Sequence, residues 1–201
     1  MTPQQYGVGA RFTLSVYDSD YVNIILGALA GVDRTGLSIK TNDISTFVTG
    51  SEQRVLEYIC AVIARAASSG AHLSAAILLS RGCPGELKCD LPPGVSALGG
   101  SPINLELTTI RARAHWSLYP LIDGGPTAAE QDHMAPIYQA IEHAKQVGVY
   151  SGSDHYATRL DGDLATVLAT AASAWINVGA VVQHVATHLT VSINSPSEIV
   201  D

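Results

Sequence analysis

Side chains able to bind or transform a small molecule occur twice in this chain, in the same order. His72 and Ser80 end one alternating segment, and His184 and Ser192 hold the same places 112 residues later. A histidine ring can stack, form hydrogen bonds or exchange a proton near neutral pH, and a hydroxyl both donates and accepts. We interpret these residues as walls of two related pockets. The alternative is that each histidine caps the C-terminal end of a preceding helix.

A second matched pair of segments carries carboxylate, hydroxyl and imidazole groups. Residues 42–46, NDIST, correspond to residues 154–158, DHYAT. Such groups can accept a hydrogen bond from an exocyclic amine or face a cation. The alternative is turn chemistry, because Asn and Asp bond their own backbone in tight connections, and we favour it for Asn42 and Asp154. The candidate ligand-binding residues in these segments are Asp43, Ser45, Thr46, His155, Tyr156 and Thr158.

The spacing of these residues does not match known catalytic or metal-binding patterns. His184 and His188 would lie about 13 Å apart along a strand, too far for one zinc ion. The sequence has no GxSxG, Walker or GxGxxG motif between a strand and a helix, and no spacing joins Ser, His and Asp as a triad. We therefore expect no catalytic residue, no metal, no cofactor and no enzymatic activity.

The matched segments belong to an internal duplication. A shift of 112 residues aligns the middle and end of a first unit with a second, whereas a shift of 102 aligns RFTLSVY, residues 11–17, with RAHWSLY, residues 113–119. The difference indicates an insertion at residues 123–132. A stretch rich in Pro, Gly and Ser separates the units and reads as a linker. We predict two units and a linker, at residues 7–86, 109–198 and 87–108.

Hydrophobic periodicity predicts the same elements in each unit. Strict alternation in residues 11–17 and 72–80 is typical of strands, and apolar stripes predict helices near residues 19–30 and from Ser51. The second unit repeats them, with helices near 128–146 and from Asp163, and short strands lie between the helices at 37–42, 44–49, 148–153 and 155–160. We predict an α+β fold, a tandem duplication of a ferredoxin-like βαββαβ unit, with two antiparallel four-stranded sheets and helices on one face of each.

The helix-free face of each predicted sheet is polar and aromatic. The last strand of such a unit lies beside the first, so side chains from both strands should meet on this face. A face of this kind can bind a small ligand, or it can pack against the sheet of another repeat or subunit. The candidate residues on it are Ser15, Tyr17, His72 and Ser80 in the first unit, and Ser117, Tyr119, His184 and Ser192 in the second.

Composition limits the partners. The net charge of −7 argues against nucleic acid, whose phosphates need basic residues. The sequence has no apolar run of about 20 residues, so no membrane insertion is expected. The N-terminus lacks the features of a secretory signal, and three cysteines are an odd count that favours reduced thiols. We expect a cytoplasmic protein.

With both units laid out, the chain resembles the YkoF family of thiamine/hydroxymethylpyrimidine (HMP)-binding proteins. The segments that carry the resemblance are RFTLSVYDSDYVNII, KTNDISTFVTGS and AHLSAAILLSRGCPGE, and then AHWSLYPL, SDHYATRLDGD and VATHLTVSINSPSE. The resemblance implies that each repeat holds one thiamine or its pyrimidine moiety, that the protein is a homodimer, and that it serves thiamine or HMP salvage or transport without catalysing a reaction. One position departs from the family pattern, because Asp43 stands where a histidine is expected and His155 keeps that place in the second repeat. The two sites are therefore expected to differ in affinity or ligand.

An aminopyrimidine ring is flat, apolar on its faces and polar on its edge. Under this hypothesis Tyr17, Tyr119 or Tyr156 stacks on the ring, and the hydroxyls of Ser15, Ser117, Thr46 and Thr158 meet the ring nitrogen and the amine. An acidic rim would favour the cationic thiazolium of thiamine. Two other functions stay open: a tandem ferredoxin-like regulatory module that senses another small metabolite, and an enzyme that uses His155 or His184.

Overall fold

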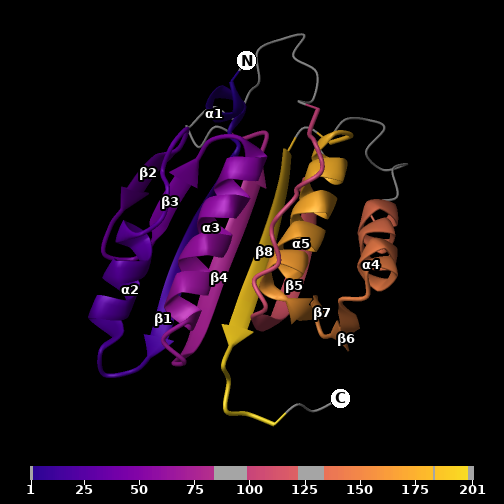
Figure 1. The fold of residues 1–201 in the computed structure, drawn as a ribbon. Helices are drawn as coiled ribbons and strands as arrows, with labels where there is room; N and C mark the ends of the chain where they lie inside the picture. The colour runs from indigo at the N-terminus through magenta and orange to yellow at the C-terminus, as the bar shows by residue number, and fades with distance from the viewer. Residues whose placement is uncertain (1, 84–98, 122–133, 183, 199–201) are drawn as a thin grey trace.

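One antiparallel sheet runs through the whole molecule and carries its helices on a single face (Figure 1). The computed structural model describes residues 2–83, 99–121, 134–182 and 184–198. Its eight strands lie in the order β2-β3-β1-β4-β8-β5-β7-β6. Each half of the chain contributes four neighbouring strands.

The predicted βαββαβ order is present in both halves. A short helix, α1 (Pro3–Tyr6), precedes the first half. The first half consists of β1 (Gly9–Tyr17), α2 (Tyr21–Ala30), β2 (Ser38–Thr41), β3 (Thr46–Thr49), α3 (Glu52–Ala67) and β4 (His72–Arg81). The second consists of β5 (Arg111–Leu121), α4 (Ala135–Val147), β6 (Tyr150–Asp154), β7 (Ala157–Asp163), α5 (Leu164–Gly179) and β8 (His184–Ile193). The predicted insertion, and the start of the helix predicted at 128–146, lie outside the described residues.

The prediction of two separate four-stranded sheets is wrong. The last strands of the two halves, β4 and β8, pair antiparallel from Leu73 opposite Ile193 to Arg81 opposite Val185. An unpaired edge strand exposes a row of backbone donors and acceptors, and here each half satisfies the edge of the other. The pairing relates the halves by a pseudo-twofold axis between β4 and β8.

The alignment of the first strands is also corrected by two residues. Tyr17 lies opposite His72, but the residue opposite His184 is Leu121 and not Tyr119. The structural counterpart of Arg11 is therefore His115, and that of Gly9 is Arg113. A slip of two residues keeps every side chain on its face of the sheet, so alternation alone could not detect it.

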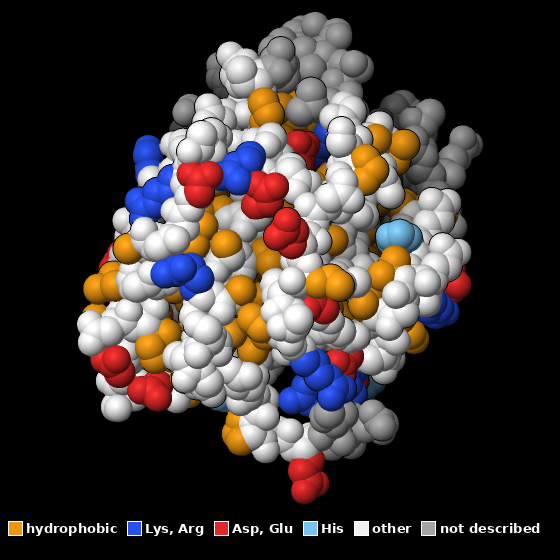
Figure 2. Space-filling model, in the orientation of Figure 1, with side chains coloured by type: hydrophobic (Ala, Val, Ile, Leu, Met, Phe, Trp, Pro, Cys, Tyr) orange, Lys and Arg blue, Asp and Glu red, His pale blue; other side chains and the backbone are white. Residues whose placement is uncertain are grey.

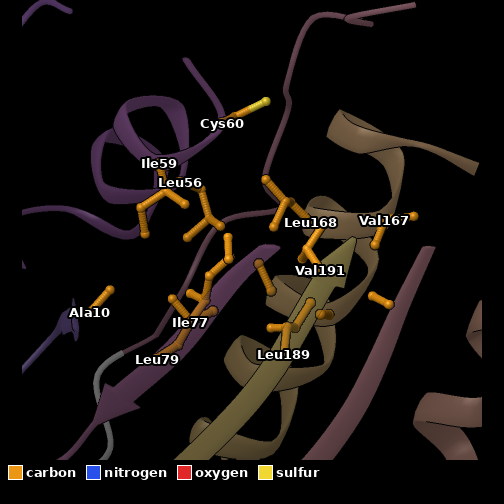
Figure 3. Close-up of a cluster of buried hydrophobic side chains, with 14 of the residues drawn as sticks. Ala10, Leu56, Ile59, Cys60, Ile77, Leu79, Val167, Leu168, Leu189 and Val191 are labelled. Carbon is orange, nitrogen blue, oxygen red and sulfur yellow. The ribbon is translucent and has the colours of Figure 1, made fainter. Parts of the chain in front are cut away.

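The apolar side chains of both halves form one continuous core. Ser51 and Asp163 cap the N-termini of α3 and α5 through their side chains, as their residue types predict. Figure 3 shows Leu56 and Ile59 of α3 above Ile77 and Leu79 of β4, with Leu168 of α5 and Leu189 and Val191 of β8 beside them. Because the buried cluster continues across the β4–β8 junction, the two halves share one hydrophobic core.

Residues 99–108, the end of the predicted linker, run between α3 and α5 over the helices (Figure 1). Ile103 of this segment is buried. The side chain of Gln53 donates to the backbone carbonyl of Asn104 at 2.6 Å and accepts from its N–H at 3.0 Å. This part of the linker is therefore built into the helix layer.

Arg81, at the end of β4, joins the two halves beneath this segment. Its side chain is fully buried, and its Nε lies 3.2 Å from Oε1 of Glu52. Its Nη1 donates to the carbonyl of Ile176 on α5 at 3.0 Å, and its Nη2 donates to the carbonyl of Gly99 at 3.2 Å. A buried cation is tolerated only when it is paired and hydrogen-bonded in this way.

None of the helices in the described ranges is both long enough and apolar enough to traverse a bilayer.

Candidate functional site

The helix-free face of the first half contains a pocket of about 700 Å³. All four strands of that half contribute to it, together with α1 and one residue of the second half. Its lining consists of Gln4, Gly7, Val8, Gly9, Ala10, Arg11, Ser38, Lys40, Phe47, Thr49, Leu78, Ser80, Cys83 and His184. We call it the first pocket.

The floor of the first pocket is one row of side chains across four strands. Lys40 on β2 lies opposite Phe47 on β3, and Phe47 lies opposite Arg11 on β1. Arg11 lies opposite Leu78 on β4. The Arg11 guanidinium is 5.6 Å from the centroid of the Phe47 ring, within the range of a cation–π contact. Its Nη1 donates to Oγ of Ser45 at 2.8 Å. The row thus places an aromatic surface between two cationic side chains.

The wall of the first pocket nearest the centre of the sheet comes from the other half of the chain. Nε2 of His184 lies 3.3 Å from Oγ of Ser80. The same contact recurs on the other side of the pseudo-twofold axis, where Nε2 of His72 lies 3.4 Å from Oγ of Ser192. Each histidine therefore lies against the serine of the other repeat and not against its own. His72 also stacks on Tyr17, with ring centroids 4.7 Å apart.

The second half has a smaller counterpart of about 230 Å³, which we call the second pocket. Its lining consists of Arg113, Ala114, His115, Ser151, Arg159, Leu160, Thr190, Ser192, Ser195 and Ser197. Ser192 stands where the first pocket has Ser80, and Arg159 stands where it has Phe47. The two halves thus use the same place on the sheet with different side chains.

Acidic side chains accompany the basic ones around the second pocket. Nη2 of Arg111 lies 2.7 Å from Oδ2 of Asp161, and Arg113 lies opposite Asp161 in the strand register. The hydrogen bond from Arg111, with the charges of Arg111, Arg113 and Arg159, outweighs burial and lowers the pKa of Asp161. Oδ2 of Asp154 lies 2.8 Å from Nε2 of His115 and 3.7 Å from Nε of Arg159.

The predicted ligand-binding residues divide into three groups. Ser80 and His184 line the first pocket, and Ser192 lines the second. Five others lie on the helix-free face farther along the strands, namely Ser15, Tyr17, His72, Ser117 and Tyr119, and His72 stacks on Tyr17. The third group belongs to the two hairpin turns.

The turn residues lie outside the first and second pockets, and Asp43, Ser45 and Thr46 line a separate cavity of about 120 Å³. Asp43, His155 and Tyr156 are exposed, and Tyr156 is 99% exposed with a φ of 67°. Thr46 and Thr158 are buried opposite the core residues Phe12 and Trp116, on the helix-covered side. Ser45 is buried and supports Arg11. As predicted for Asn42, its side chain accepts from backbone N–H groups of the turn, at Ile44 and Ser45.

The predicted set lacked the charged and aromatic floor of the pockets. Arg11 could have been found, because alternation already places it on the helix-free face. Lys40 and Phe47 lie on four-residue strands, β2 and β3, whose register a short pattern does not determine. A comparison of the two repeats could not identify Arg159, because the corresponding residue of the first repeat is the aromatic Phe47.

The helix-covered face carries a larger groove, of about 980 Å³, between α3 and residues 104–108. Basic, acidic and apolar side chains are intermixed on this face (Figure 2). In the groove, Arg54 forms ion pairs with Asp33 and Glu57. These three side chains are therefore paired within the protein, and the first pocket, with its aromatic floor, is the better candidate for a ligand site.

A model of the YKOF-related family matches residues 7–86 and again residues 111–198. The chain belongs to the YKOF-related family. The two matched ranges contain the strands β1–β4 and β5–β8, so the family unit occurs twice, as the duplication in the sequence indicated.

A curated relative supports the same membership. The chain is 30% identical over 192 residues to the "Putative HMP/thiamine-binding protein YkoF" of Bacillus subtilis (strain 168), and the match covers 94% of this chain and 91% of the relative. The resemblance stated from the sequence is thereby confirmed for the YKOF-related family.

Proposed function

We propose that this protein binds thiamine or its hydroxymethylpyrimidine moiety without transforming it, in the salvage or transport of these compounds. The name of the relative supports a binding role. The observation that carries the proposal is the first pocket, which combines the Phe47 ring with hydroxyl and imidazole groups in about 700 Å³. Pockets of this size suit small ligands.

The chemistry of the pocket fits an aminopyrimidine. The Phe47 ring offers an apolar aromatic surface against which a flat heteroaromatic ring can pack. The hydroxyls of Thr49 and Ser80 can accept from the exocyclic amine, and His184 can bond a ring nitrogen. A polar edge group left unpaired on binding costs about 1–3 kcal/mol, so these side chains would determine specificity.

Binding without a reaction is part of the proposal, and the relative at 30% identity is named as a binding protein. Nε2 of His184 and Oγ of Ser80, 3.3 Å apart, are assigned here to hydrogen bonds with the ligand. Thiamine recovered intact after prolonged incubation with the protein is the expected result.

The test is calorimetry with thiamine and with free hydroxymethylpyrimidine, on the native protein and two variants. Phe47→Ala removes the proposed stacking surface and should weaken binding roughly tenfold. Tyr156→Ala removes a ring that is fully exposed at a turn and should leave binding unchanged. No heat with either compound at protein concentrations well above micromolar would contradict the proposal, and so would the opposite ranking of the two variants.

The proposal extends to assembly and location. Tyr17 and Tyr119 are exposed on the helix-free face, which leaves that face able to pack against a second copy as a homodimer. Light scattering of the purified protein tests this, since a monomer mass would rule it out. The thiol of Cys60 is free, which fits a cytoplasmic protein, and fractionation of cells tests the location.

A further inference from the structure

Among the described residues, no acidic side chain pairs with the positive charges of the first pocket. Arg11 bonds the neutral hydroxyl of Ser45 and lies over Phe47. Across the described part of the chain, no carboxylate lies within ion-pair distance of Arg11 or Lys40. The pocket is thus a cationic spot on a chain whose net charge is −7.

In the second half, acidic side chains lie beside the corresponding row and pair with its basic residues. The row of Lys40, Phe47, Arg11 and Leu78 becomes Gly152, Arg159, His115 and Thr190. Thr49 of the first pocket becomes Asp161. Both Arg159 and His115 contact Asp154, and Arg111 pairs with Asp161. The first half therefore carries two cations with no described counter-charge, whereas the second half pairs the basic side chains of its own row with acidic neighbours.

The sign of this charge bears on the ligand. Two cationic side chains on either side of Phe47 repel a thiazolium cation and attract an anion. Arg11 and Lys40 lie on the two strands that flank Phe47, and their long side chains are well suited to a phosphate, which accepts several charge-assisted hydrogen bonds. The described residues that line this pocket include no acidic side chain of the kind that would favour the thiazolium.

We infer that the first pocket selects the phosphate ester of its flat heteroaromatic ligand, with Arg11 and Lys40 holding the phosphate and Phe47, Ser80 and His184 holding the ring. The inference rests on the proposed function and names the ionic form of its ligand. Phosphorylated hydroxymethylpyrimidine should bind best, the neutral alcohol less well, and cationic thiamine least. The second pocket should show no such ranking.

Calorimetry with four probes tests the ranking: hydroxymethylpyrimidine, its phosphate ester, thiamine and inorganic phosphate. The ester should bind at least about tenfold tighter than the alcohol, and its advantage should shrink as salt is added. Lys40→Gln and Arg11→Gln should each reduce the ratio of the two affinities toward one. Arg65→Gln, which removes one positive charge from the exposed surface of α3 on the opposite face, is the matched control and should leave the ratio unchanged.

The outcomes separate the inference from the proposed function. If the alcohol or thiamine binds but the ester binds no tighter, or if the ratio is the same in all three variants, the inference is overturned and the proposed function stands. If inorganic phosphate binds as tightly as the ester, the ring contributes nothing and the inference is again overturned. If none of the three pyrimidine compounds binds, the proposed function fails and the inference fails with it.

Discussion

His184 lies at the start of the last strand, yet its Nε2 contacts Oγ of Ser80 in the other repeat at 3.3 Å. The pairing of β4 with β8 causes this exchange, because it places the beginning of each strand beside the end of the other. The wall of the first pocket is therefore completed by the opposite half of the chain. A single repeat expressed alone would lack both the wall and its partner strand.

This exchange predicts a crossed effect of mutation. His184→Ala should weaken binding in the first pocket by about threefold to tenfold, because one hydrogen bond contributes about 1 kcal/mol. His72→Ala should leave the first pocket unchanged, although His72 belongs to the first repeat. The readout is protection of Cys83, which lines the first pocket, from alkylation as ligand is added. Equal loss of protection in both variants would show that the histidines act through the fold.

The thiols should differ in reactivity. Burial, and secondarily the charge of Asp163, raises the pKa of Cys60 to about 11, so at pH 8 roughly one Cys60 in a thousand is a thiolate. Cys83 is only half-buried. Mass spectrometry after brief treatment with N-ethylmaleimide at pH 8 should find Cys83 modified and Cys60 intact. Rapid modification of Cys60 in the native protein would contradict its burial.

The Glu52–Arg81 ion pair should be important for stability. Glu52→Gln leaves the fully buried Arg81 guanidinium without its carboxylate and should lower the free energy of unfolding by about 3 kcal/mol. Glu142→Gln breaks an exposed pair with Lys145 and should cost far less, because solvent screens exposed ion pairs. Urea denaturation of the two variants measures the difference. Similar losses of unfolding free energy in both variants would mean that the backbone carbonyls that accept from Arg81 stabilise its charge without Glu52.

A buried hydrogen-bond chain should stabilise the second half. Oγ1 of Thr187 accepts from Nε1 of Trp116 at 2.7 Å and donates to the carbonyl of Ser117 at 2.8 Å. Thr187→Val keeps the shape but leaves both groups unpaired, which should cost about 2 kcal/mol. Thr190→Val, an exposed site on the same strand, is the control and should be nearly neutral in urea denaturation. A neutral Thr187→Val would indicate that water replaces the hydroxyl.

Asp163 should make stability depend on pH in the acid range. Burial raises its pKa, but hydrogen bonds from Thr108, Ala165 and Thr109 outweigh burial, so the pKa lies below 3.8. A lowered carboxyl pKa stabilises the fold at pH values above the unfolded value, and that contribution is lost as pH falls through the folded pKa. The free energy of unfolding of the native protein should therefore drop below about pH 4.

The matched variant is Asp163→Asn, because asparagine is also a good N-cap but does not titrate. The difference in unfolding free energy between native protein and variant, measured in urea from pH 3 to 7, should be largest near neutrality and shrink toward pH 3. A difference that is independent of pH would show that the carboxylate charge is not what holds residue 108 to α5.

The sequence alone was sufficient to predict the duplication, the order of elements, the caps at Ser51 and Asp163, and which side chains of the long strands face away from the helices. These features depend on residue type and on periods of two or 3.6 residues, which are local properties of the chain. The candidates Ser80, His184 and Ser192 followed from that reasoning and lie in pockets.

Only the tertiary structure decided which half completes which pocket. Strand pairing brings together residues more than one hundred positions apart, such as Ser80 and His184. The alternation of side chains along a strand reveals neither which strand pairs with its edge nor whether the register has shifted by two residues. The same pairing placed Lys40, Phe47 and Arg11 in one row and moved Thr46 and Thr158 to the core side. The charge of the pocket, and hence the ionic form of the ligand that we infer, is a property of that row and of no single segment of the sequence.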